Sequence, residues 1–290
     1  MELIFSTLIN GLSLGGIYAM IALGYTMVYG IAKLLNFAHG DIIMVGGYVI
    51  FVFMAYNNPL LAVFMAVVCC VLLGILIEKV AYKPLRGASP LAVLITAIGI
   101  SYLLQSLAQI IFGSAPKMVT VFDFGIIQIM GITIQISSLV TLAVASVVMI
   151  ALTLFVKYSR LGRAMIAVSE DKDAAQLMGI NVNRIITITF AIGSALAALA
   201  GLFYLLKAPS VSSTLGAMPG IKAFTAAVIG GIGSIPGAML GGILLGLVES
   251  ISYKITVIAP YTDAIEFSIL ILILLVRPTG FLGKKRREKV

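Results

Sequence analysis

The chain has 290 residues, of which 61% are hydrophobic and only 10% are charged, and its mean hydropathy is +1.16. These values exclude a soluble globular domain and indicate a single polytopic membrane domain over residues 1–290. The net charge of +8 does not indicate a nucleic-acid partner, because half of it comes from the basic tail at residues 283–290. A basic cluster beside a membrane span is typical of a cytoplasmic face.

Long apolar runs predict an all-α membrane protein with about eight transmembrane helices, because a bilayer-spanning helix needs roughly 20 apolar residues. The predicted spans are residues 3–28, 38–56, 59–80, 91–113, 138–156, 186–206, 234–256 and 262–276. The connections near Lys33, at 79–86 and at 157–184 carry basic residues. The positive-inside rule therefore places the loop 157–185 and the C-terminal tail in the cytoplasm, and the N-terminus outside.

The stretch "NFAHGD" opens the second predicted span. Asn36 suits the cap of that helix, and Asp41 suits its positive N-terminal end. His39 is the only histidine of the chain. A lone histidine at a helix start is commonly a hydrogen-bonding end group, but it can also titrate, so Asn36 and His39 are candidate pathway or gating residues.

Residues 114–137 are predicted to face outward. Within them, Ile127–Ile136 alternates apolar and polar residues around Met130 and Gly131, which predicts a small β-hairpin. The other outward segment, residues 207–220, is polar and rich in turn residues. Together the two segments form either a docking surface for an external partner or a plain surface cap.

A cytoplasmic tail requires an extra crossing or a fold-back between Lys207 and Pro260. The stretch Gly220–Leu240 fits this need, because its first part is too short to span a bilayer and "GGIGSIPG" then breaks it. We predict a discontinuous or re-entrant element here, with a surface-lying amphipathic segment as the alternative. Its candidate pathway or gating residues are Gly230, Gly231 and Gly233.

Small residues recur at four-residue spacing, for example at Gly11 and Gly15 and at Gly242 and Gly246. This spacing favours close packing of membrane helices, which gain little from the hydrophobic effect inside lipid. We therefore expect helix backbones to approach one another at these glycines.

Ionisable residues are rare in the spans, and a charge within the bilayer normally faces a partner or a cavity. Lys254 and Glu266 lie six residues on either side of Pro260, so a helical hairpin around Pro260 brings them to similar depth. We predict a structural ion pair between them. Glu249 either lines the pathway or hydrogen-bonds a hydroxyl on a neighbouring helix, and Glu78 is expected to reach the surface from a helix end.

The sequence lacks the patterns of several kinds of site. It has no G-x-x-x-x-G-K-[ST] phosphate loop, so the chain does not hold ATP by that device. With one histidine it offers neither a Ser/His/Asp set nor a Cys/His set. We therefore expect a transport subunit without catalytic residues, metal site or cofactor of its own. If the chain is part of a pump, its energy comes from another subunit.

The loop at residues 157–185 holds eight charged residues in a chain that otherwise avoids charge. Ser169 is a good N-cap and Gly179 is a natural helix stop, so the pattern predicts a short helix at 170–178. This helix is either a rigid knob that offers its apolar face to a partner or a loop helix packed on its own protein.

Within this loop, "DAAQLMG" resembles the EAA loop of ABC-transporter permeases, with Asp173 in place of the glutamate and Gly179 at the expected glycine. The Leu-Pro of the general motif does not follow. Other stretches resemble the high-affinity branched-chain amino-acid ABC permease family, specifically its LivH-type subunit. They are "NGLSLGGIYAMIALGYTMVYG", "NFAHGD", "GRAMIAVSEDKDAAQLMGIN", "KAFTAAVIGGIGSIPGAMLGG" and "RPTGFLG". The resemblance covers nearly the whole chain in the expected order.

The resemblance implies a permease subunit of an ATP-driven importer of leucine, isoleucine and valine in the inner (plasma) membrane of a bacterium. It implies as partners a second, LivM-type permease, two cytoplasmic ATPases that hold ATP and Mg, and an external substrate-binding protein. ATP binding would move the helix at 170–178 and switch the pathway between outward and inward access. The implied ATPase-coupling residues are Arg163, Glu170, Asp173, Ala174, Ala175, Leu177, Met178 and Gly179.

Three other functions compete with this one. A related ABC permease for urea or short amides shares much of the same pattern. A stand-alone ion-coupled secondary transporter would need a coupling-ion site, and the spans show no clustered Asp, Glu and His residues. An intramembrane enzyme is disfavoured by the missing catalytic patterns.

Overall fold

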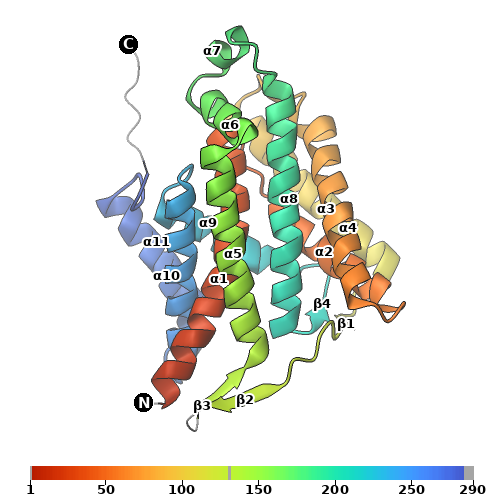
Figure 1. The fold of residues 1–290 in the computed structure, drawn as a ribbon, viewed down its shortest axis with the longest axis vertical. Coiled ribbons are helices and arrows are strands. Elements are labelled where there is room, and N and C mark those ends of the chain that lie inside the picture. Colours follow the sequence, from red (N-terminus) through yellow and green to blue (C-terminus); the bar gives the residue numbers. More distant parts are fainter. Residues whose placement is uncertain (1, 130–131, 284–290) are drawn as a thin grey trace.

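The computed structural model describes residues 2–129 and 132–283. Its helices form one bundle with their axes running mostly lengthwise (Figure 1). The helices of the first half are α1 (Glu2–Ala32), α2 (His39–Met54), α3 (Pro59–Ile77) with a π-helical turn at Glu78–Tyr82, α4 (Pro90–Phe112) and α5 (Ile136–Tyr158). Those of the second half are α6 (Arg160–Glu170), α7 (Lys172–Leu177), α8 (Val182–Lys207), α9 (Ala217–Gly230), α10 (Ile235–Lys254) and α11 (Thr262–Val276), the last preceded by a 3₁₀ turn at Ala259–Tyr261.

Seven helices of the described part are long and apolar enough to cross a membrane. Every predicted span coincides with a helix, but the expected span at 38–56 is the 16-residue α2, which is short for a bilayer. The 14-residue α9 is the short element predicted before the glycine-rich break. The chain is therefore a helical membrane protein that combines full spans with two shorter helices.

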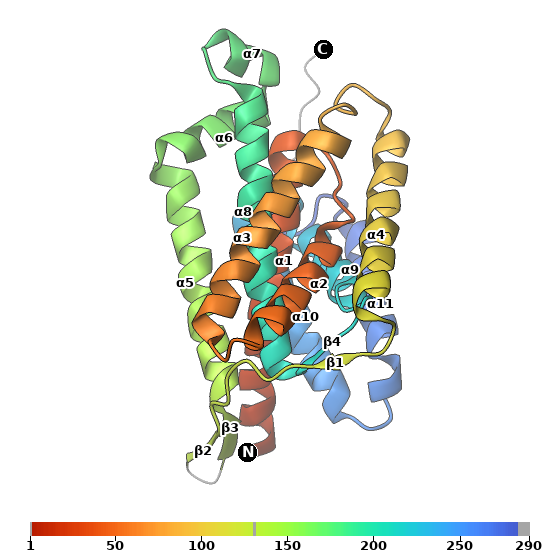
Figure 2. The same cartoon turned by 90° about the vertical axis from the view of Figure 1, so that its right-hand side faces the viewer.

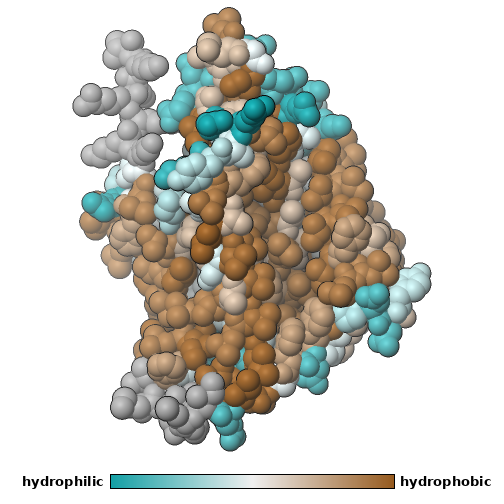
Figure 3. All heavy atoms as spheres, viewed as in Figure 1, coloured by the Kyte–Doolittle hydropathy of each residue, from teal (hydrophilic) through white to brown (hydrophobic). Residues whose placement is uncertain are grey.

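The central helix is α1, which packs against α5, α8, α9 and α10 (Figures 1 and 2). The most apolar window of α1 is 94% buried, whereas the corresponding windows of α4 and α11 are 17% and 11% buried. Apolar side chains cover the visible flank of the bundle, and polar ones gather around α6 and α7 at one end (Figure 3). This pattern is that of a protein whose sides face lipid or another membrane protein.

Glycines allow α1 and α10 to cross closely, as their spacing predicts. A Cβ at Gly246 would collide with the backbone of Gly15, and a Cβ at Gly242 would collide with the backbone of Ala19. Such close contact stabilises the helix pair through dispersion forces, because lipid provides no hydrophobic driving force for helices to associate.

The two short helices, α2 and α9, meet at their N-terminal ends inside the bundle. The backbones of Gly40 and Gly216 are in such close contact that neither position has room for a Cβ. At its other end α9 stops at Gly230, and the chain turns through Gly231 (φ 107°) and Gly233 (φ 92°) before Ser234 caps α10. Positive φ at both glycines explains why the break predicted near 220–240 needs this residue type.

All strands of the described residues belong to the two segments predicted to face outward. The strands β2 (Ile126–Ile129) and β3 (Ile132–Gln135) pair antiparallel, with Ile127 opposite Ile134, as the alternation predicts. The turn positions 130 and 131 lie outside the described residues. The strands β1 (Lys117–Met118) and β4 (Ser210–Val211) also pair, so the structure joins the segments 114–137 and 207–220.

Candidate functional site

The charged loop folds as two helices rather than the single helix predicted at 170–178. The helix α6 begins at a Ser159 cap, and α7 begins at Asp171, whose Oδ1 accepts from the backbone N–H groups of Asp173 and Ala174 at 3.0 Å each. Ser169 was predicted to be the cap, and this was wrong: its hydroxyl donates to the Ile166 carbonyl at 2.7 Å. Asp171 caps because its carboxylate accepts two orphan N–H groups at once and also matches the positive end of α7.

The tip of α7 exposes two apolar side chains. Leu177 is 89% exposed and Met178 is 83% exposed, and Gly179 ends the helix with φ 82°. Ala175 points the other way and is buried against the rest of the chain. The helix α7 stands at one end of the bundle (Figure 1). It therefore packs on its own protein through one face and presents a bare apolar tip.

The remaining predicted coupling residues outside the tip are exposed on α6 and α7. Asp173 and Ala174 are exposed on α7, and Arg163 and Glu170 are exposed on α6. Asn181 caps α8 immediately after the tip, accepting from the Arg184 N–H at 3.0 Å. The knob is thus held between two capped helices, and its local conformation is well determined by short-range hydrogen bonds.

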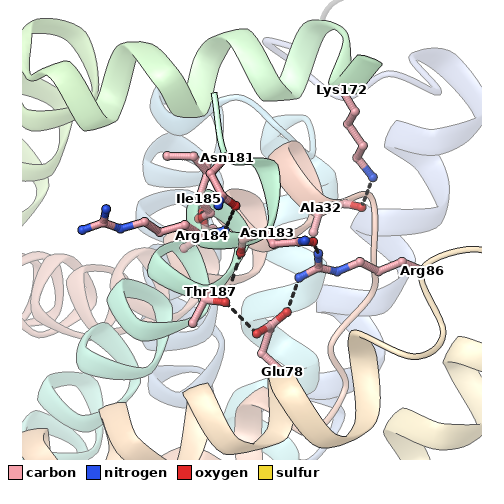
Figure 4. Close-up of polar contacts among 10 residues, drawn as sticks. Ala32, Glu78, Arg86, Lys172, Asn181, Asn183, Arg184, Ile185 and Thr187 are labelled. Carbon is pink, nitrogen blue, oxygen red and sulfur yellow. Dashed lines mark hydrogen bonds and ion pairs between the residues drawn. The ribbon is translucent and has the colours of Figure 1, made fainter. Parts of the chain in front are cut away.

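Polar contacts tie α7 to α1, and the start of α8 to the turn that follows α3 (Figure 4). The Lys172 ammonium donates to the carbonyl of Ala32, at the end of α1, at 2.9 Å. Burial lowers the pKa of this ammonium from its ordinary value, and the charge of Arg86 lowers it further, while Asp173 opposes the shift. The start of α8 is held by Glu78, which accepts from the Thr187 hydroxyl at 2.8 Å.

Arg86 completes this network by pairing with Glu78 and donating to the Asn183 side chain (Figure 4). Glu78 was expected to reach the surface, but its side chain is completely buried. A buried carboxylate is stable only when it is paired and hydrogen-bonded, and here Arg86 and Thr187 fulfil that need. The sequence did not reveal this network, because Glu78 and Arg86 lie between α3 and α4 whereas Asn183 and Thr187 belong to the distant α8.

Arg86→Met is expected to destabilise the chain by about 3–5 kcal/mol, because it leaves the buried Glu78 carboxylate without its cation. Thermal unfolding of the purified protein measures the effect. The double variant Glu78→Gln/Arg86→Met should recover part of the loss, since no buried charge then remains. Arg184→Met is the matched control, because Arg184 is exposed and its guanidinium points away from the network (Figure 4); an equal loss in the control would contradict this role.

A cavity of about 810 Å³ lies between the charged loop and the break that separates α9 from α10. Ser169, Glu170 and Asp171 line it from one side, and residues 232–236 line it from the other. The end of α1 supplies Thr26, whose buried hydroxyl has no hydrogen-bond partner among the described residues. The charged loop, the end of α1 and the helix break therefore face one another across this cavity.

The predicted gating glycines have different surroundings. Gly233 lines the cavity, whereas Gly230 is in tight backbone contact with Gly237, and Gly231 with Gly280 and Gly283. Close packing at Gly230 and Gly231 favours a fixed bend, whereas Gly233 faces the cavity. Their part in gating stays a prediction.

Asn36 and His39 are both buried, but neither lines this cavity. Asn36 accepts a hydrogen bond from the Tyr82 hydroxyl at 2.9 Å. The imidazole of His39 packs edge-on against Tyr25, with ring centroids 4.8 Å apart, and fills the space beside Gly24. Their surroundings are those of packed residues in this conformation.

A buried ion cluster joins the last three helices. Lys222 of α9 lies 3.1 Å from Glu249 of α10, 2.8 Å from Asp263 and 3.3 Å from Glu266 of α11. Glu249 also accepts from the Tyr18 hydroxyl of α1 at 2.6 Å, which matches the hydroxyl contact considered for it.

The predicted Lys254–Glu266 pair is wrong in its cation. Lys254 is exposed at the end of α10, and Glu266 turns inward to meet Lys222. The residue that sequence reasoning missed, Lys222, is the one charge within the apolar stretch "GIKAFTAAVIG" of α9. A lone charge in a membrane helix is a signal of a partner or a function, and it was available in the sequence.

Curated relatives and a family model match this chain over nearly its full length. Among solved structures, "PsaBC from Streptococcus pneumoniae in complex with Fab" overlaps with a TM-score of 0.49 and 14% identity, covering 96% of this chain and 93% of that one. The BraD permease of Pseudomonas aeruginosa, from a high-affinity branched-chain amino acid transport system, is 45% identical over 98% of this chain and 97% of its own length. The corresponding LivH protein of Escherichia coli is 43% identical over 97% of this chain and 96% of its own length. The family model described as "Branched-chain amino acid transport system / permease component" matches residues 7–274, and the chain belongs to this family.

Proposed function

We propose that this chain is the permease subunit of an ATP-driven importer of branched-chain amino acids, namely leucine, isoleucine and valine. The observation that carries the proposal is the 45% identity to BraD over nearly the full length of both chains, since BraD is a permease protein of such a system. The chain is a transport subunit and not an enzyme, and ATP and Mg belong to separate ATPases.

The exposed tip of α7 supports a docking role for those ATPases. Leu177 and Met178 supply the apolar centre of the contact, and Arg163, Glu170 and Asp173 supply its polar rim. This division resembles the core and rim of protein interfaces generally. Lys172 links α7 to α1, and Glu78 with Arg86 links the start of α8 to the turn after α3, so movement of α7 and α8 is passed to these helices. The charged loop also faces the α9–α10 break across the cavity.

A second permease, of the LivM type, is proposed to cover part of the exposed flank. The span α4 is poorly buried, and its exposed residues include Gly99 and Ser106. Small and polar residues on an exposed membrane helix favour contact with another helix rather than with lipid. An external binding protein completes the proposed complex. The chain is proposed to lie in a bacterial inner membrane, with the loop 157–185 and the tail 283–290 in the cytoplasm.

Reconstitution of the complex with its binding protein in liposomes tests this function. ATP-dependent uptake of radiolabelled leucine is expected, and excess isoleucine or valine should reduce it at least about tenfold, whereas excess urea should leave it unchanged. Competition by urea and not by isoleucine would instead assign the chain to transport of urea or short amides. Leucine uptake without the ATPases would contradict an ATP-driven mechanism.

A further inference from the structure

The Lys222 cluster holds more carboxylates than cations. One ammonium faces Glu249, Asp263 and Glu266, all within 3.3 Å of its nitrogen. The side chains of Lys222 and Glu266 are 6% and 0% exposed, whereas that of Asp263 is 50% exposed. The three carboxylates therefore form a site shaped around one R–NH₃⁺ group, and Lys222 occupies it.

The carboxylates of this site are short of hydrogen-bond donors. Glu249 receives a bond from Tyr18, whereas the completely buried Glu266 contacts the Lys222 ammonium and the Glu249 side chain and accepts from no neutral donor among the described residues. Its contact with Lys222 at 3.3 Å is the longest ion pair of the cluster. A buried carboxylate held by one long ion pair is costly, so Glu266 is placed to gain from an ammonium that lies closer to it than that of Lys222.

The cluster reaches the surface of the bundle at Asp263. Asp263 is half exposed at the start of α11, and α11 is the least buried of the candidate spans. Lys222 belongs to α9, a short helix that is broken at Gly231. A cation approaching Asp263 would reach Glu266 one turn further along α11.

We propose that this cluster binds the zwitterionic head group of the amino-acid cargo. The cargo ammonium replaces the Lys222 ammonium among the carboxylates, and the released Lys222 pairs with the cargo carboxylate. Every ion keeps an opposite partner, so the exchange avoids the large cost of leaving a buried charge uncompensated. A neutral amide such as urea cannot make this exchange. The inference rests on the proposed function and names the cargo chemistry that the permease recognises.

The exchange also connects cargo to the coupling end of the molecule. Lys222 is the residue that ties α9 to both α10 and α11 through ion pairs. When Lys222 turns to the cargo, α9 loses these ties. The chain that follows α9 lines the cavity opposite the charged loop. Cargo at one end of α9 and ATPase movement at the other therefore act on the same short helix.

Ligand binding to the assembled complex, without binding protein and in phosphatidylethanolamine–phosphatidylglycerol nanodiscs, tests the exchange. Competition against radiolabelled leucine compares leucine with leucinamide, which lacks the carboxylate, and with 4-methylpentanoate, which lacks the ammonium. The complex should prefer leucine to either analogue by at least about tenfold, the effect of one charge-assisted hydrogen bond. Lys254→Met, a matched change of an exposed lysine, should behave as the unmodified chain.

Each of the two cluster variants should lose the preference for leucine over one of the two analogues. Lys222→Met should bind leucine no better than leucinamide, and Glu266→Gln should bind leucine no better than 4-methylpentanoate. Glu266→Gln keeps the pairs of Lys222 with Glu249 and Asp263, so it is the variant expected to fold if Lys222→Met does not.

If a variant binds all three ligands more weakly by the same factor, the cluster has only a structural role and the proposal is overturned. Absence of saturable leucine binding by the unmodified complex would overturn it as well. Either result leaves ATP-driven leucine uptake intact, whereas failure of the proposed function would appear as absence of that uptake.

Discussion

Leu177→Asp is expected to lower ATP-driven uptake by at least about tenfold while the chain still inserts and folds. The side chain is 89% exposed at the tip of α7, so the change costs the isolated chain little. In an interface, an apolar anchor carries about 2 kcal/mol or more, and each 1.4 kcal/mol is tenfold in affinity. An aspartate there adds the cost of an unpaired buried charge. Co-purification of the ATPases and ATP-dependent leucine uptake measure the two effects.

Val257→Asp provides the matched control. Val257 is 81% exposed in the connection between α10 and α11, at the opposite end of the bundle from α7 (Figure 2). This variant should retain the ATPases. Ala175 is not a suitable position for testing the docking contact, because it is buried and its substitution would disturb α7 itself. Full uptake and normal ATPase binding by Leu177→Asp would rule out the tip as the coupling contact.

Gly246→Val is expected to destabilise the chain by more than about 3 kcal/mol, above the usual cost of overpacking. A Cβ at this position would meet the backbone of Gly15, and backbone atoms of a central helix cannot move aside as side chains do. The separation of α1 from α10 would disturb the best-buried helix of the bundle. A large fall in the thermal unfolding temperature, with a low yield of folded protein, is the expected measurement.

The control for this variant is Gly99→Val in α4. No atom lies within 4 Å of a Cβ built there, so a change within about 0.5 kcal/mol is expected for the isolated chain. Unchanged stability of Gly246→Val would mean that α1 and α10 do not need this close approach.

Local signals in the sequence predicted much of the fold. Apolar run length located the helices, because spanning a bilayer imposes a length that is visible without any tertiary contact. The stop at Gly179 and the strand alternation around residues 127–134 were confirmed as well, because each depends on neighbouring residues alone. The discontinuity after Gly230 was also predictable, since the glycines that permit it are adjacent in sequence.

Where two local choices competed, the sequence alone was insufficient. Ser169 and Asp171 are both good caps, and the structure extends α6 through Ser169 and starts α7 at Asp171. The choice depends on how much of α6 packs against the bundle: Met165 and Val168 are buried, which favours continuing that helix to Glu170.

The sequence by itself determined that this chain is a helical membrane protein, where its helices lie and where its charged knob is placed, because these depend on hydropathy, charge bias and short-range capping. The tertiary structure alone decided which charges meet. Glu266 pairs with Lys222, 44 positions away, and not with Lys254, which is 12 positions away. Depth along a helix can be counted from sequence, but the direction in which a side chain points depends on how three helices pack, and that direction selects the partner of a buried charge.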